Sequence, residues 1–243
     1  MKHTFRCIVS DLAPGATVEL TSADTHHLIR VARRSIGDHI ELIDTQGQLW
    51  SAQLVELGPP ARAHVAPTPK PAPPTLPVRL WVGLADFGRL DTLVEKATEL
   101  GVAAITVISS ARVRRIPDRE AFITRRARMV RVAEAAAKQS GRAVIPEIAG
   151  VTAFADAVAT PAAGARVLID PRGRAGLGEL LREIGGPVDI IIGPDAGFDP
   201  TELELAASAA VQIARMGDAV LRTETAALAA LVIAADGLGM LGT

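Results

Sequence analysis

A proline-rich segment divides this chain. Residues 66–77 read APTPKPAPPTLP and hold six prolines in twelve residues. Because proline fixes φ and lacks a backbone N–H, so dense a run cannot continue a helix or a central strand, and it favours a stiff extended connector. We therefore expect two domains that meet at this segment, residues 1–70 and residues 71–243.

The part before the connector is rich in short β-type runs. TFRCIV, DHIELIDTQGQLWSAQLVEL and ARAHVA have the residue pattern of strands, and DTQGQ supplies turn residues between alternating flanks. One helical segment, TSADTHHLIRVARRS, interrupts them. The pattern predicts a small β-barrel or another β-rich domain.

The part after the connector alternates strand and helix. Five runs are apolar on both faces and suit a buried parallel sheet: 78–84, 105–109, 166–170, 188–193 and 211–216. Helices are expected over 89–100, over 118–139, from a start at DPTE, and after LRTET to near Gly237. At DPTE, Asp199 can cap the amide of Glu202, and Pro200 fits the first helical position. This alternation predicts a doubly wound α/β domain.

Composition excludes several classes of protein. Of the 243 residues 49% are hydrophobic and 22% charged, which is typical of a folded chain and not of a disordered one. The single cysteine, Cys7, cannot form an internal disulfide, and we interpret it as an inert small apolar residue in place of a reactive thiol. The N-terminus lacks the apolar stretch of a signal peptide, and no run is long enough to span a membrane. We expect a cytoplasmic protein.

Charge is balanced overall, at −1, but it is unevenly distributed. Residues 112–142 hold ten Lys or Arg against three acids, whereas residues 193–243 hold two against seven. The basic side chains are Arg112, Arg114, Arg115, Arg119, Arg125, Arg126, Arg128, Arg131, Lys138 and Arg142. Such a cluster indicates either a phosphate-binding surface or a solvated helix face.

Three loops follow predicted strands and are the first places to look for a ligand. Parallel sheets bind ligands at the carboxyl ends of their strands, where this chain has DPRGR, GPDAGF and MGDAVLRTET. No G-x-G-x-x-G follows a first strand and no P-loop motif occurs, which disfavours NAD, FAD and ATP. The glycines allow close backbone approach and favour an adenosine-sized ligand, although GPDAGF also suits a plain strand-to-helix turn.

Other catalytic patterns are weak. All five histidines precede the connector, and no Cys/His cluster has metal-ligand spacing, so we expect no metal. No G-x-S-x-G motif occurs. His26 and His27 suit a helix start or an RNA contact better than a metal site.

The last helix has a polar entrance. LRTETAALAAL places Arg222, Thr223, Glu224 and Thr225 at the start of an Ala- and Leu-rich helix. These side chains either cap the helix and form an internal Arg–Glu pair, or they act on a ligand.

Several motifs together resemble one family. EKATELGV (95–102), KQSGR (138–142), IIGPDAGF (191–198), LRTETAAL (221–228) and HHLIRVARRSIGD (26–38), with the hairpin IDTQGQLWSAQL, are similar to the RsmE-type ribosomal RNA uridine N3-methyltransferases of the SPOUT class. The similarity covers nearly the whole chain. It implies a PUA-like RNA-binding β-barrel followed by a SPOUT-type parallel sheet with a C-terminal trefoil knot, in a homodimer.

The same resemblance implies a function and a set of site residues. The expected cofactor is S-adenosylmethionine, and the expected substrate is a uridine of small-subunit ribosomal RNA. The expected cofactor-binding residues are Leu168, Ile169, Asp170, Ile192, Gly193, Pro194, Gly197, Met216, Gly217, Leu221, Thr223, Thr225 and Ala226. The expected RNA-binding residues are Arg6, His27, Arg30, Arg33, Arg34, Arg89, Lys96, Gln139 and Arg142.

Catalysis is expected to fall to Arg222 and Glu224. Arginine stays protonated, so Arg222 cannot be a base but can stabilise negative charge that develops on the uracil. Glu224 is expected first to orient Arg222 and otherwise to accept the proton, and Thr223 and Thr225 are expected to cap the helix. Two alternatives stay open: a SPOUT methyltransferase acting on transfer RNA or a ribose 2′-hydroxyl, and a non-catalytic RNA-binding or ribosome-assembly protein.

The chain departs from the family pattern at three places. Asp195 and Ala196 stand where the family commonly has Glu and Gly in G-P-E-G-G. Asp218 and Ala219 replace a proline and an arginine, which weakens any inference of positive charge beside the methionine carboxylate. Arg89 stands where a lysine is usual.

Overall fold

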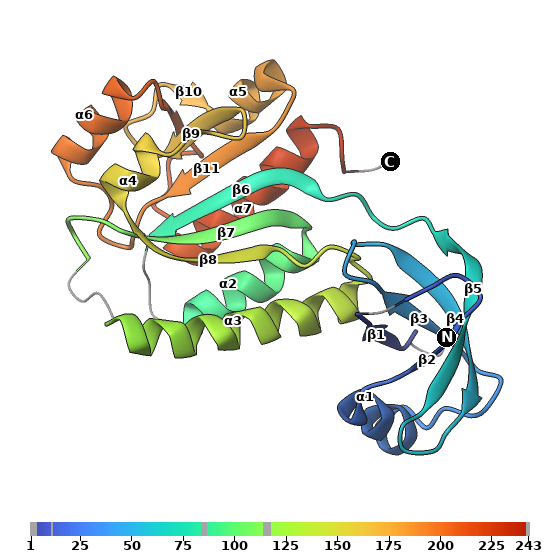
Figure 1. The fold of residues 1–243 in the computed structure, drawn as a ribbon. Coiled ribbons are helices and arrows are strands. Elements are labelled where there is room, and N and C mark those ends of the chain that lie inside the picture. The colour runs from blue at the N-terminus through green and yellow to red at the C-terminus, as the bar shows by residue number, and fades with distance from the viewer. Residues whose placement is uncertain (1–3, 11, 84–86, 114–117, 242–243) are drawn as a thin grey trace. The chain divides into compact units, whose positions relative to one another are not determined.

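The computed structural model describes residues 4–10, 12–83, 87–113 and 118–241 (Figure 1). The chain forms two compact units. The smaller comprises residues 1–74 with 137–145, and the larger comprises residues 75–136 with 146–243. Sequence patterns did not indicate that residues 137–145 return to the smaller unit. Arg114 and Arg115, part of the predicted basic cluster, lie outside the described residues.

The smaller unit contains a five-stranded sheet in the order β1-β3-β4-β5-β2. Its strands are β1 (Arg6–Ile8), β2 (Thr17–Glu19), β3 (His39–Ile43), β4 (Leu49–Glu56) and β5 (Arg62–Lys70). β1 pairs with β3 in parallel, and the other pairs are antiparallel. One side of the sheet carries a core that includes Leu28, Leu42 and Cys7, all fully buried. Cys7 is a free cysteine and is buried, which agrees with its interpretation as an inert apolar residue.

The helical segment of this unit is shorter than predicted. α1 (Ser22–His26) begins after Thr21, whose side chain accepts a hydrogen bond from the Asp24 amide, and it continues as a π-helical turn (His27–Val31). The expected helix over 21–35 therefore ends early. Arg33, with φ of 47°, has left the helical region of the Ramachandran map.

The proline-rich segment is not a connector along its whole length, so that part of the prediction is wrong. β5 runs to Lys70, where Trp50 pairs with Pro69 and Leu49 with Lys70. β2 pairs with β5 only over residues 62–64. Among the described strands, the far part of β5 thus has one open edge, where prolines without an N–H are tolerated.

The larger unit contains a seven-stranded sheet in the order β10-β12-β9-β11-β6-β7-β8. Its strands are β6 (Leu76–Gly83), β7 (Val102–Ser109), β8 (Glu147–Ala153), β9 (Ala165–Ile169), β10 (Ala175–Gly176), β11 (Val188–Ile192) and β12 (Gln212–Arg215). Every pairing in it is parallel, which confirms the predicted parallel sheet. β8 and β10 were not predicted.

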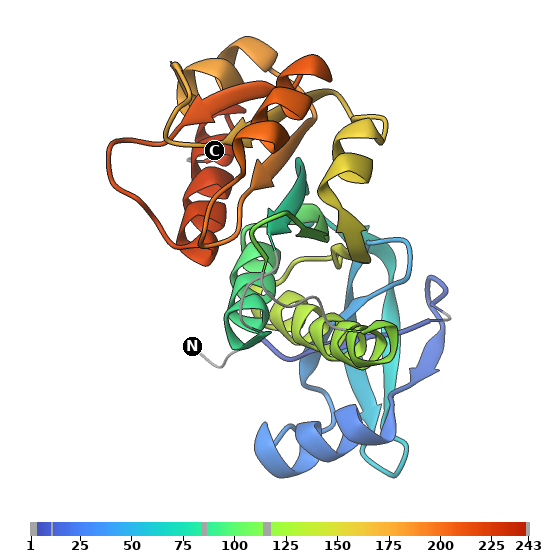
Figure 2. The same cartoon turned by 90° about the vertical axis from the view of Figure 1, so that its left-hand side faces the viewer.

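Helices cover both faces of this sheet (Figures 1 and 2). They are α2 (Phe87–Glu99), α3 (Arg119–Ser140), α4 (Phe154–Ala159), α5 (Leu177–Ile184), α6 (Pro200–Ser208) and α7 (Thr223–Gly237). α4 packs with α6, while α7 packs with α2 and α5. The predicted capping box of α6 is present, with Glu202 accepting from the Asp199 amide at 2.8 Å. α4 and α5 were not predicted.

A buried ion cluster lies within the sheet. Asp189 on β11 is fully buried and accepts hydrogen bonds from Arg79 at 2.6 and 2.7 Å and from Arg166 at 2.8 Å. Arg166 also donates to two backbone carbonyls, of Val158 and Thr160. Because a buried charge is tolerated only when it is paired and hydrogen-bonded, the three side chains depend on one another.

Candidate active site

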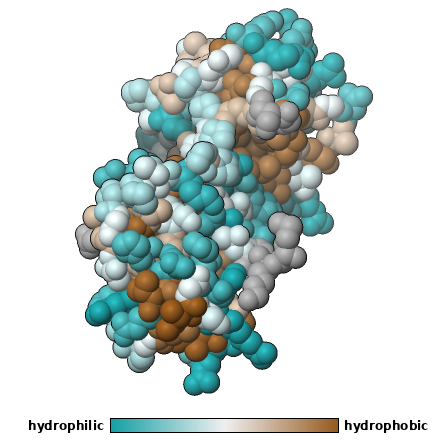
Figure 3. All heavy atoms as spheres, turned by 90° about the vertical axis from the view of Figure 1, so that its right-hand side faces the viewer, coloured by the Kyte–Doolittle hydropathy of each residue, from teal (hydrophilic) through white to brown (hydrophobic). Residues whose placement is uncertain are grey.

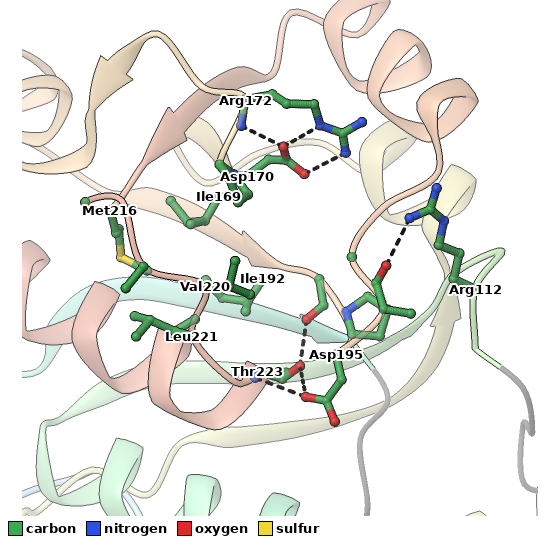
Figure 4. Close-up of a pocket in the computed structure, with 18 residues that line it drawn as sticks. Arg112, Ile169, Asp170, Arg172, Ile192, Asp195, Met216, Val220, Leu221 and Thr223 are labelled. Carbon is green, nitrogen blue, oxygen red and sulfur yellow. Dashed lines mark hydrogen bonds and ion pairs between the residues drawn. The ribbon is translucent and has the colours of Figure 1, made fainter.

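A pocket of about 300 Å³ lies at the carboxyl edge of the seven-stranded sheet (Figure 4). It is lined by the loops that follow β9, β11 and β12, by the first turn of α7 and by Arg112. β12, β9 and β11 are neighbours in the sheet, so these three loops meet although they are far apart in the sequence. Figure 2 shows the segment between β12 and α7 as an extended loop. The location agrees with the general rule for ligands of parallel sheets.

Glycines let backbone segments approach closely here. Gly193 continues from β11, and a Cβ on it would lie 2.9 Å from the Phe198 ring. Gly83 ends β6, and a Cβ on it would lie 2.3 Å from the backbone nitrogen of Pro194. Both distances are shorter than real Cβ contacts. The close packing of the 193–197 loop therefore requires glycine at positions 83 and 193.

Thr223 joins the entrance of α7 to the 193–197 loop. Its hydroxyl lies 2.9 Å from the Gly193 carbonyl oxygen and 3.2 Å from Asp195 Oδ1, which also accepts from the Thr223 amide at 3.3 Å. The residue at the N-cap of α7 is Arg222, and it makes no side-chain capping bond. The expectation that Thr223 and Thr225 cap the helix is therefore wrong, because Thr223 is used by the loop and Thr225 is exposed.

Arg89, on α2, binds acids from two other segments. Its Nη1 lies 2.6 Å from Asp195 Oδ2 and 3.7 Å from Glu224 Oε2. Glu224 thus pairs with Arg89, and the expected pairing with Arg222 is wrong because the Arg89 side chain reaches Glu224 from another helix. Within the described part of the chain, Arg222 is exposed and has no recorded ion-pair partner.

The acids of the pocket are held ionised. Partial burial by itself raises the pKa of the Asp195 carboxyl, but hydrogen bonds from Arg89 and Thr223 outweigh it and lower the pKa. Asp170 behaves similarly: burial raises its pKa, and the hydrogen bonds of Arg172 lower it below its ordinary value. Arg172 binds Asp170 through Nε at 2.7 Å and Nη2 at 2.9 Å. The pocket therefore presents carboxylates that already have cationic partners.

Two further arginines line the pocket, Arg112 and Arg172, and the sequence analysis did not include them among the expected site residues. Arg112 donates to the Ala196 carbonyl oxygen at 3.0 Å and lies 3.8 Å from Asp199. Arg172 also donates to the Phe198 carbonyl oxygen, at 3.3 Å. Arg112 follows β7, a predicted strand, so the rule that places ligands at strand ends pointed to it; Arg172 lies within the quoted DPRGR loop.

Most of the expected cofactor-binding residues meet in this pocket. Eleven of the thirteen line it: Ile169, Asp170, Ile192, Gly193, Pro194, Gly197, Met216, Gly217, Leu221, Thr223 and Ala226. Leu168 does not, because successive strand residues point to opposite faces and Leu168 belongs to the core on the α4 and α6 side. Thr225 is exposed on α7 and does not line the pocket either.

None of the expected RNA-binding residues is among the residues that line this pocket. Arg30, Arg33 and His27 are exposed on or just after the helical segment of the smaller unit, and His27 makes an edge contact with Phe5. The Gln139 side chain is exposed as well. An RNA contact by these residues stays a prediction.

Other members of that set have intramolecular partners. Arg6 binds Glu41 at 2.7 Å and two backbone carbonyls, and Arg142 donates to the Pro74 carbonyl oxygen. Lys96 pairs with Glu95 and Glu99 at 2.7 and 2.8 Å, and Arg34 lies 4.0 Å from Asp38. These contacts favour structural roles.

The basic face of α3 is partly neutralised. Arg125 and Arg128 both contact Asp91, at 3.0 and 2.8 Å, and Arg126 donates to the Ile148 carbonyl oxygen. Arg131 is exposed. Among the described residues no group of three or more His, Cys, Asp or Glu side chains is placed to hold a metal ion. No helix in the described ranges is both long and apolar enough for a membrane span.

Comparisons with known proteins give the class. A family model described as an RNA methyltransferase domain matches residues 72–235, and one described as an RNA methyltransferase PUA domain matches residues 20–61. The fold and the site thus define an RNA methyltransferase with an appended PUA-type domain.

Curated relatives narrow the class to one family. Ribosomal RNA small subunit methyltransferase E of Mycobacterium bovis is 30% identical over 89% of this chain and 85% of its own length. The Synechocystis protein of the same name is 29% identical over 89% of this chain and 72% of its own length. This chain belongs to the ribosomal RNA small subunit methyltransferase E family.

A solved structure agrees with both the fold and the family. The Neisseria gonorrhoeae ribosomal RNA small subunit methyltransferase E, solved bound to S-adenosyl methionine, has a TM-score of 0.85 and 27% identity. The match covers 96% of this chain and 98% of that one.

Proposed function

We propose that this chain transfers a methyl group from S-adenosylmethionine to N3 of a uridine in small-subunit ribosomal RNA. The observation that carries the proposal is the pocket at the carboxyl edge of the sheet, which opens beside the entrance of α7, where Arg222 is exposed. Membership of the family supports the cofactor and the RNA substrate. The resemblance of LRTETAAL to the motif of the uridine N3-methyltransferases supports N3 of the uracil as the position that is methylated.

The residues of the pocket fit this cofactor. Ile169, Ile192 and Leu221 supply apolar surface for an adenine ring, and the Gly193 backbone can approach it closely. The ionised Asp170 and Asp195 suit hydroxyl groups and a neighbouring positive charge. Bound S-adenosylmethionine supplies an electrophilic methyl group on a sulfonium, so the protein needs chiefly to align a nucleophile.

Arg222 is assigned to the uracil. Once N3 has lost its proton, negative charge spreads to the flanking carbonyl oxygens, and a fixed cation nearby stabilises that charge. Arg222 is exposed beside the pocket and has no recorded ion-pair partner among the described residues, so its guanidinium is available. Because Glu224 does not orient Arg222, accepting the N3 proton is the role that this proposal assigns to it.

Small-subunit RNA from cells that lack the protein provides the test. The RNA is incubated with the purified chain and S-adenosylmethionine, digested to nucleosides and analysed by mass spectrometry. We expect N3-methyluridine, at a rate on the order of 100- to 1000-fold lower for Arg222→Ala. Arg182→Ala, which removes an exposed arginine of α5, is the matched control and keeps the rate.

Other outcomes contradict the proposal. A 2′-O-methylated nucleoside, or methylation of transfer RNA in place of small-subunit RNA, replaces the proposed substrate. Absence of any product together with absence of S-adenosylmethionine binding by calorimetry favours a non-catalytic RNA-binding protein.

RNA binding is assigned to the smaller unit. Arg30 and Arg33 are exposed close together in sequence, near the exposed His27. We expect Arg30→Ala to weaken RNA binding at every sequence and to reduce the slope of log affinity against log salt by about 0.7 to 0.9. An unchanged slope removes Arg30 from the interface.

The proposal also includes the organisation implied by the resemblance. It comprises a domain boundary near residue 70, a trefoil knot at the pocket loops, and a cytoplasmic homodimer. Val232 of α7 is 43% exposed although it lies on a mostly apolar helix, and such a face suits a second copy. Figure 3 shows hydrophobic side chains gathered in patches on one face of the surface. The molar mass measured by light scattering at increasing salt tests the dimer. A mass that stays at the monomer value contradicts it.

A further inference from the structure

Arg89 lies where three separate segments meet. It extends from α2 toward the 193–197 loop and the first turn of α7. Its Nη1 is 2.6 Å from Asp195 Oδ2 and 3.7 Å from Glu224 Oε2. A guanidinium is suited to this task because its donors are spread over a rigid plane.

The contacts continue from Asp195 into the pocket. Asp195 uses one carboxylate oxygen for Arg89 and the other for the amide and hydroxyl of Thr223. The Thr223 hydroxyl also lies 2.9 Å from the Gly193 carbonyl oxygen. Gly193, Asp195 and Thr223 all line the pocket, whereas Arg89 does not. Arg89 therefore acts on the pocket through Asp195.

Glu224 depends on the same arginine. Its Oε2 is buried and, among the described residues, has no hydrogen-bond partner. The Arg89 guanidinium pairs with it at 3.7 Å. Without Arg89 this partly buried carboxylate loses its ion-pair partner, and the neighbouring Arg222 becomes the available cation. Pairing with Arg89 thus keeps Glu224 away from Arg222.

We propose that Arg89 is a positioning residue for the methyl transfer: it fixes the 193–197 loop through Asp195 and pairs with Glu224. Among the described residues, Arg222 is thereby left without an ion pair and is available for the substrate. This inference rests on the proposed function. It replaces the expectation that Arg89 binds RNA.

The length of each side chain makes the proposal testable. In Arg89→Lys the charge remains, but a single shorter ammonium group cannot hold both carboxylates at these distances. In Asp195→Glu the acid is one methylene longer and pushes against Arg89. In the double variant Arg89→Lys/Asp195→Glu the longer acid compensates for the shorter base.

The experiment measures the affinity for S-adenosylmethionine by calorimetry without RNA, and kcat and KM for RNA separately. We expect each single variant to lose about tenfold in cofactor affinity and a similar factor in kcat, with KM for RNA little changed. The double variant recovers most of both losses. Arg182→Lys, which changes an exposed side chain of α5, is the matched control and keeps wild-type values.

Two results overturn the proposal. If Arg89→Lys and Arg89→Ala keep the wild-type affinity for S-adenosylmethionine but raise KM for RNA and lower its salt dependence, Arg89 binds RNA directly. If the losses of the single variants simply add in the double variant, the two side chains do not act as a pair. Failure of the proposed function is distinct, because then the wild-type chain itself does not bind the cofactor or form N3-methyluridine.

Discussion

Replacing Gly83 by alanine tests whether the cofactor loop is seated on the end of β6. A Cβ at this position would lie 2.3 Å from the Pro194 nitrogen and 2.6 Å from the Gly193 carbonyl carbon. Nonbonded heavy atoms are comfortable at about 3.5 Å, so the loop or the strand end must move by roughly 1 Å. Both atoms are backbone, which cannot move aside by changing a rotamer.

The displacement has two measurable consequences. Overpacking of this kind costs about 1 to 3 kcal/mol of stability. A shift of roughly 1 Å in a positioning loop lowers the rate on the order of 100-fold. Gly83→Ala is therefore expected to bind S-adenosylmethionine weakly and to methylate RNA slowly while it remains folded.

Calorimetry measures the affinity for the cofactor, thermal unfolding measures stability, and the methylation assay measures the rate. Gly150→Ala, on β8 of the same unit, is the matched control because nothing lies within 4 Å of a Cβ there. The control should leave all three readings unchanged. If Gly83→Ala binds the cofactor and turns over like the wild type, the loop is not held by this contact and the reasoning is wrong.

Three further predictions follow from the contacts described above. Asp189→Asn leaves the buried Arg166 without its counterion and should lower the free energy of unfolding, measured by chemical denaturation, by about 3 to 5 kcal/mol. Glu19→Gln, which breaks an exposed ion pair, should lower it by about 1 kcal/mol or less. Equal losses in the two variants contradict this prediction. Burial, with a smaller contribution from a nearby carboxylate, raises the pKa of the Cys7 thiol, so a thiol reagent should label it only after unfolding, and rapid labelling of the native chain refutes burial. The folded-state pKa of Asp170 lies below its ordinary value of 3.8. The stabilising contribution of its carboxylate is therefore complete above that value and is lost as pH falls through the folded pKa. Between pH 6 and pH 2 the melting temperature should depend less on pH in Asp170→Asn than in the wild type.

The sequence predicted the elements that are buried on both faces. The runs at 78–84, 105–109 and 188–193 became β6, β7 and β11, because strands covered by helices on both sides are largely apolar on both faces. β8 was missed because it lies at the edge of the sheet, is half-exposed and contains Gly150. α4 is only six residues long, too short for a helical period to be recognised.

Strand order is the part of the fold that no local pattern contains. β9 lies between β11 and β12, and β6 lies beside β11, although the chain visits these strands in another order. The rule about carboxyl ends identified each loop of the pocket separately. Only the order of the sheet shows that the three loops join in one site and that Gly83 lies against one of them.

Ion pairs between distant segments were likewise beyond prediction. Sequence distance made Arg222 the natural partner of Glu224, yet the side chain that reaches Glu224 comes from α2. Similarly, Asp91 takes up Arg125 and Arg128 from the basic helix α3. A charge pattern along one helix says which side chains are present, but not which acids the neighbouring helix offers.

Two departures from the family pattern become a single feature in the structure. Taken separately, Asp195 is a shortened acid in the cofactor loop, and Arg89 keeps the charge of the usual lysine but changes its hydrogen-bond geometry. The altered loop makes a non-catalytic protein conceivable. In the structure they contact each other at 2.6 Å, and Asp195 still accepts from Thr223 with its other oxygen. A shorter acid needs a longer base to close the same gap, and arginine supplies that length with a planar set of donors. The altered 193–197 loop is therefore still fixed against α2 and α7, so its changed residues do not by themselves indicate a non-catalytic RNA-binding protein.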